Sequence, residues 1–195
     1  MLFRSRRYIY IEDQAFHSRE VFDWINQAVR LNDDLHVILL IGLVDPNDTP
    51  SDAEAKFIRI AVNNHLVKGL TPDQIDRIGL FSDRNKVIHS KTTLIDDVWA
   101  MAGSANSMRR SLYSDFEHSV SWMEESSVAV RDYRVSLWGT HLQRTVFDLD
   151  AALSAWFSLP YQGAANVDFT GIERVRLPMP QTTLTEEEEV LYDEV

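Results

Sequence analysis

Residues 87–120 read VIHSKTTLIDDVWAMAGSANSMRRSLYSDFEHSV, and this stretch decides how the rest of the chain is interpreted. It places His89 two residues before Lys91, continues through a small polar run at 103–106, and ends in an acidic segment at 115–117. Such a run is either a hairpin with polar turns or a site that binds an anion. The choice depends on which side chains share a face.

The first part of the stretch predicts a strand over residues 86–92. Because side chains two apart on a strand point to the same side, His89 and Lys91 would face one side together. An imidazole and an ammonium group would then converge. Asp96 falls outside this alternation, so we expect it to hold the turn that follows rather than to reach the same point.

A second predicted strand, at 98–102, would run back beside the first and end in small polar residues. Gly103 allows the backbone to approach a ligand closely. Ser104 and Asn106 can both donate hydrogen bonds to phosphate oxygens. These residues would lie near the end of the sheet.

A third predicted strand, at 116–122, would supply carboxylates. Alternation places Asp115 and Glu117 on one face, where either could accept a hydrogen bond from His89. A carboxylate on one imidazole nitrogen fixes the tautomer and leaves the other nitrogen free to attack or to transfer a proton. These groups together form an internally consistent set for a site that binds an anion.

The remaining histidines and the tryptophans have no comparable surroundings. We interpret five histidines as structural or surface residues: His17, His36, His65, His118 and His141. The five tryptophans lie in apolar stretches, which favours positions in the core over ligand contacts.

Composition limits the class of protein. The 195 residues are 45% hydrophobic and contain no cysteine, which suits one globular domain without disulfides or a thiolate metal site. The formal net charge is −11, which argues against binding to nucleic acid, although six of the 30 acidic residues lie in the last ten positions. No segment has the length of a membrane span or the pattern of a signal peptide, so the expected default is a soluble, cytoplasmic chain.

Hydrophobic periodicity predicts alternating strands and helices. Further strands are expected at 7–13, 36–44 and 78–82. Helices are expected at 18–31, at 52–67, within 127–146 with an end near Gly139 or slightly beyond, and at 148–159. The pattern predicts an α/β protein with helices on both faces of one sheet. We expect residues 1–160 to form one lobe, and 161–195 to be an extended C-terminal segment that ends in an acidic, disordered tail.

The segments singled out above resemble the phospholipase D superfamily. HSKTTLIDD has the pattern H-x-K-x4-D, GSANSMRRSLYSDFE follows at the family's spacing, and IYIEDQAF and SLWGTHL are similar to its flanking segments. The resemblance spans residues 7–145. It implies an α/β/α sandwich with a mixed central sheet, and phosphodiester cleavage without a metal or cofactor.

The resemblance also implies a role for each residue of the motif. A histidine of this family forms a phosphohistidine, so His89, Lys91 and Glu117 would be catalytic, with Glu117 orienting His89. The phosphate would be held by Lys91, Ser104 and Asn106. Four residues would support the site: Gln14, Asp96, Gly103 and Asp115.

The family's active site joins two such motifs, and this sequence holds one, because no other histidine is followed two residues later by lysine. The second motif would come from an identical chain in a twofold dimer or from an N-terminal lobe. The similarity of RYIYIEDQAF to the opening of the second lobe in two-motif lipid enzymes favours a C-terminal catalytic lobe.

The sequence is therefore compatible with three functions. The first is a lobe that hydrolyses phospholipid head groups or transfers them by transphosphatidylation, with transient contact with a membrane surface. The second is a homodimeric nuclease or other phosphodiesterase of the same superfamily, which the acidic charge disfavours. The third is an inactive half that acts as a binding or interaction protein.

Overall fold

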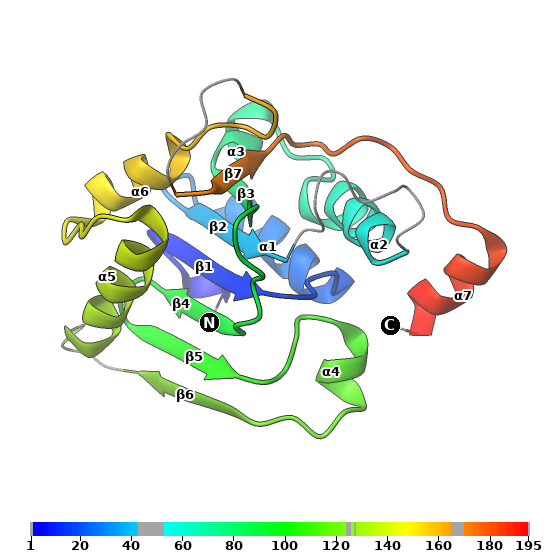
Figure 1. Cartoon of the computed structure of the whole chain (residues 1–195), viewed down its shortest axis with the longest axis horizontal. Helices are drawn as coiled ribbons and strands as arrows, with labels where there is room; N and C mark the ends of the chain where they lie inside the picture. Colours follow the sequence, from blue (N-terminus) through cyan, green and yellow to red (C-terminus); the bar gives the residue numbers. More distant parts are fainter. Residues whose placement is uncertain (1, 43–52, 124–125, 127, 165–169, 195) are drawn as a thin grey trace.

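The computed structural model describes residues 2–42, 53–123, 126, 128–164 and 170–194. Seven strands form one mixed sheet, and helices cover both of its faces (Figure 1). The predicted α/β/α sandwich is therefore confirmed. Within the described residues, no helix is both long and apolar enough to cross a membrane.

The sheet has the order β6-β5-β4-β1-β2-β3-β7. Its strands are β1 (Tyr8–Asp13), β2 (His36–Ile41), β3 (Ile78–Asp83), β4 (Thr92–Ile95), β5 (Trp99–Gly103), β6 (Ser119–Met123) and β7 (Ile172–Val175). The three strands β1, β2 and β3 are parallel, and every other pairing is antiparallel.

The helices are mostly short. They are α1 (Arg19–Leu31), α2 (Ala53–Ala61), α3 (Pro72–Asp76), α4 (Arg109–Tyr113), α5 (Val128–Leu142), α6 (Leu149–Phe157) and α7 (Glu186–Glu194), with a 3-10 turn η1 (Leu2–Arg4) and a π-helical turn η2 (Val62–Leu66) that continues α2. Ser18 caps α1 by accepting a hydrogen bond from the backbone N–H of Val21.

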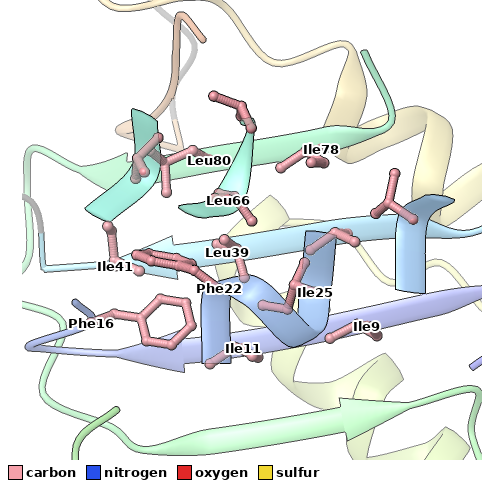
Figure 2. Close-up of a cluster of buried hydrophobic side chains, with 14 of the residues drawn as sticks. Ile9, Ile11, Phe16, Phe22, Ile25, Leu39, Ile41, Leu66, Ile78 and Leu80 are labelled. Carbon is pink, nitrogen blue, oxygen red and sulfur yellow. The ribbon is translucent and has the colours of Figure 1, made fainter. Parts of the chain in front are cut away.

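The core forms two layers, one on each face of the sheet. Alternation along β1 turns Ile9 and Ile11 toward α1 and α2, where Phe22 of α1 packs with them (Figure 2). The other face of β1 packs against α5 and α6. Because both faces are covered, β2 is a continuous apolar run rather than an alternating one. Trp138 and Trp156 are buried as expected, whereas Trp24 is 42% exposed.

The predicted strand at 86–92 is wrong, because β4 begins only at Thr92. After β3 the chain turns: the Asp83 carboxylate accepts hydrogen bonds from the backbone N–H groups of Asn85 and Lys86. The chain then runs as an irregular loop up to Lys91. The predicted strand at 116–122 likewise starts later, at Ser119, because α4 and a loop precede it.

The C-terminal part also differs from the prediction. The boundary at residue 160 is too early, because β7 pairs with β3 in the central sheet. The acidic segment that was expected to be disordered is helix α7, and Lys56 of α2 forms an ion pair with Glu188 at 2.8 Å. The end of the predicted strand 36–44 and the start of the predicted helix 52–67 lie outside the described residues.

Candidate active site

The motif residues gather at one end of the sheet. β4 runs antiparallel to β1, and Thr92 lies opposite Glu12, so the chain that enters β4 passes beside the residues that follow β1. β5 returns along β4, and the backbone N–H of Gly103 donates to the carbonyl of Lys91 at 3.0 Å. In Figure 1 this is the right-hand end of the sheet, where β1 and β5 end and β4 begins.

Lys91 is the buried cation of this end of the sheet. The residue is 9% exposed, and its ammonium donates to the Gln14 amide oxygen at 3.3 Å and to the His89 carbonyl at 2.7 Å. An ammonium group has three N–H donors. The described part of the chain supplies two acceptors, which leaves one donor for an anionic ligand.

Asp13 lies beside this lysine and was not predicted. Its carboxylate accepts hydrogen bonds from the backbone N–H groups of Ser107, at 2.6 Å, and Ala15, at 3.0 Å. Burial raises the pKa of Asp13 to about 6, although those hydrogen bonds and the charge of Lys91 act to lower it. Asp13 thus ties the end of β1 to the loop after β5.

His89 is exposed and lies on the loop, so it does not share a strand face with Lys91 as predicted. The two are instead joined through the His89 carbonyl. Its imidazole makes no hydrogen bond to any residue that the structure describes, so the expected bond to Asp115 or Glu117 is not formed. Asp115 is paired with the Arg110 guanidinium at 3.0 Å, and Glu117 accepts from the Ser104 hydroxyl.

The 103–106 segment lies where it was expected, at the end of β5, with Gly103 as the last residue of the strand. A Cβ on Gly103 would lie 2.6 Å from the carbonyl oxygen of His118, so only glycine fits there. Ser104 is fixed to the segment that precedes β6, because its backbone N–H donates to the same His118 carbonyl at 2.9 Å.

Asn106 is held differently from Ser104. Its side-chain oxygen is buried and has no hydrogen-bond partner among the described residues. A buried amide oxygen without a partner is costly, so nothing in the described structure holds this amide in its present orientation. The oxygen and nitrogen of such an amide exchange places by a simple flip, which would turn an N–H donor toward the same point.

Asp96 lies at the opposite end of β4 from His89 and Lys91. Its carboxylate accepts three backbone N–H hydrogen bonds: from Arg6 at 2.7 Å, from Arg7 at 2.8 Å and from Tyr8 at 2.8 Å. Its φ of 55° is in the left-handed region, which aspartate tolerates better than most residues. Asp96 therefore fixes the start of β1 and cannot touch a ligand bound at Lys91.

A second unpredicted feature lies beneath the loop. The Glu12 side chain is 6% exposed, and its carboxylate contacts His141 of α5, at 3.1 Å, and the hydroxyl of Ser90. His141, which we interpreted as a structural or surface residue, is buried and lies against this carboxylate. One feature of the sequence could have indicated that Glu12 is important: an acidic pair directly follows the apolar residues of β1 in YIYIED.

The arrangement is thus a mixed α/β/α lobe with an exposed imidazole, a buried ammonium and small polar groups at one end of its sheet. Such a set can hold an anionic ester and present it to the imidazole. A family model described as "Cardiolipin synthase, PLD-like domain" matches residues 1–135. The chain belongs to this family, within the phospholipase D superfamily of phosphodiesterases. No curated protein matches the sequence.

Solved structures share the fold at low identity. NucT from Helicobacter pylori is 16% identical, with a TM-score of 0.52 over 74% of this chain and 84% of that one. The phospholipase D family member Nuc from Salmonella typhimurium is also 16% identical, with a TM-score of 0.50 over the same shares. The phosphatidylserine synthase of Haemophilus influenzae is 15% identical, with a TM-score of 0.51 over 68% of this chain and 32% of that one.

Proposed function

We propose that this chain is a catalytic lobe of a phospholipase D-type phosphodiesterase, which cleaves or transfers phospholipid head groups. The observation that carries the proposal is the buried ammonium of Lys91, fixed beside the exposed His89 at an end of the sheet where Ser104 and Asn106 also lie. Lys91, Ser104 and Asn106 would bind the phosphate oxygens, and no metal would be required.

The chemistry needs two histidines. A nitrogen of one attacks phosphorus and forms a P–N bond, while the P–O bond to the leaving alcohol breaks and the other histidine donates a proton to that oxygen. The second histidine then removes a proton from water or an acceptor alcohol. The resulting oxygen attacks phosphorus, and the P–N bond breaks to release the product and the first histidine.

His89 can supply one of these two groups. The second motif would come from a further lobe or from an identical chain whose interface has twofold symmetry. If a further lobe supplies it, His89 is the histidine that donates and removes protons, because the C-terminal histidine has that role in two-lobe members of the family. Glu117, which contacts Ser104, would exchange that contact for His89 when the site is assembled.

An apolar cavity favours a lipid over a nucleic acid as the substrate. It has a volume of about 370 Å³, and its lining includes Ile11, Trp24, Thr93, Ile95, Trp99 and Met101. In the strand register, Ile11, Thr93 and Met101 form a row across β1, β4 and β5. Ser107 also lines the cavity, and its backbone N–H donates to the carboxylate of Asp13, which lies beside Lys91. An apolar tail could therefore lie along the sheet with its phosphate at Lys91.

A substrate panel tests this proposal. An assembled enzyme, supplied with a second motif, should cleave phosphatidylglycerol vesicles and a soluble phosphodiester dye in EDTA, and should leave single-stranded DNA intact. Met101→Glu should lower turnover of the vesicles about tenfold or more, because it places a charge in the apolar cavity, and should leave turnover of the dye nearly unchanged.

Three results would count against the proposal. Cleavage of DNA in preference to lipid would favour the nuclease. Loss of turnover in EDTA, restored by a divalent ion, would contradict the mechanism. No turnover of any substrate in a confirmed assembly would indicate an interaction protein.

A further inference from the structure

A buried carboxylate lies directly under the motif loop. One oxygen of Glu12 accepts from the Ser90 hydroxyl, and the other accepts from the Tyr10 hydroxyl at 2.8 Å and contacts Nε2 of His141 at 3.1 Å. These side chains come from β1, from the loop before β4 and from α5. One carboxylate thus joins the central strand, the loop and the helix on that face of the sheet.

The surroundings of Glu12 favour its charged form. Burial is the largest influence on its pKa and raises it, but the hydrogen bonds from His141, Ser90 and Tyr10 together bring the pKa below its ordinary value. A buried carboxylate is costly unless its oxygens are satisfied, and hydrogen bonds to a charged acceptor are stronger than neutral ones. The Ser90 hydroxyl therefore has a strong and specific anchor.

The hydrogen bond from Ser90 to Glu12 matters because of the residues next to Ser90 in the sequence. Ser90 stands between His89 and Lys91, so fixing its side chain inward fixes the direction of the backbone on both sides. Lys91 then folds back to bond the His89 carbonyl, which closes the loop upon itself. His141 in turn is held by its contact with Glu12 and by a ring contact with Trp156, whose centroid is 6.2 Å away.

We propose that Glu12 and His141 are positioning residues that hold His89 and Lys91 in place through Ser90. This inference rests on the proposed function for its catalytic consequence, but its structural part does not. Neither residue touches the substrate, since both are buried beneath the loop. They act by keeping the imidazole and the ammonium in one relative arrangement.

Hydrogen exchange tests the structural part without any need for turnover. In the full chain, Ser90→Ala should raise amide exchange in the peptide covering 84–92 about tenfold or more, because an anchored loop opens rarely and a free one opens often. Ser90→Thr keeps the hydroxyl and should restore protection. Ser158→Ala, which removes a hydroxyl bond to the Ala155 carbonyl at the end of α6, is the matched control and should leave the loop unchanged.

A double-mutant cycle tests the catalytic part in an active assembly. Ser90→Ala and Glu12→Gln should each lower kcat about tenfold, and the double variant should be no worse than either, because both break the same connection. Ser90→Thr should restore kcat. Unchanged exchange in Ser90→Ala, or additive losses in the cycle, would overturn the inference. If no assembly turns over, the exchange result still decides the positioning role, and the failure belongs to the proposed function.

Discussion

Replacing His89 with asparagine should lower phosphodiester turnover by about 1,000-fold or more in an active assembly, because the variant has no nitrogen able to attack phosphorus or to carry the proton. The fold should survive, since the imidazole is exposed and makes no hydrogen bond to the described residues. The measurement is kcat on a phosphodiester dye, with circular dichroism spectra and unfolding midpoints recorded beside it.

His118→Asn is the matched control. His118 is also exposed and lies at the same end of the sheet, where its backbone rather than its imidazole bonds Ser104. This variant should keep most of the activity. Near-normal turnover in His89→Asn would remove His89 from the mechanism, and an equal loss in His118→Asn would show that the assay reports damage to the surface rather than to the chemistry.

Asp96→Ala should produce the largest loss of stability among the motif variants. It leaves three backbone N–H groups at the start of β1 without their acceptor and places alanine at a φ of 55°. Since two of the three bonds are exposed to water, we expect the free energy of unfolding to fall by about 3 kcal/mol. Urea unfolding followed by fluorescence measures this change.

Asp96→Asn separates charge from geometry, because it keeps one acceptor oxygen and tolerates the left-handed backbone. It should lose about half as much stability as Asp96→Ala. Asp33→Ala, at a side chain that is 97% exposed, should change stability by less than about 0.5 kcal/mol. An Asp96→Ala variant as stable as the wild type but without turnover would place Asp96 in the chemistry and not in the support of β1.

The sheet and its main helices were predictable because their signals are local. The continuous apolar run of β2 and the helical spacing after Ser18 each identify an element by the residues it contains. The small polar run at 103–106 was placed correctly for a similar reason, since it ends a strand whose apolar residues define it.

The motif loop was misjudged because a short segment carries little information about where a strand begins. The segment from Lys86 to Lys91 has only two apolar residues, Val87 and Ile88, and pairing with β1 begins only where Thr92 meets Glu12. The start of a strand depends on its neighbour's register, which the segment itself does not contain.

The contacts that support the site could not be predicted from the sequence for a different reason. Glu12 and His141 are 129 residues apart, and nothing near either residue indicates the other. Asp13 and Ser107 are similarly distant, at 94 residues. Such pairs depend on the finished packing of α5 and of the loop after β5 against the central strand.

The central claim is that one motif makes half of an active site, and activity should therefore depend on assembly. The most direct measurement separates the chain by size-exclusion chromatography and assays each fraction with bis(p-nitrophenyl) phosphate at equal protein concentration. Dimeric fractions, or monomers supplied with a lobe that carries a second motif, should turn over about 100-fold faster than the monomer alone, because a lone imidazole cannot serve as both nucleophile and acid. Equal activity in a strictly monomeric fraction would contradict the account.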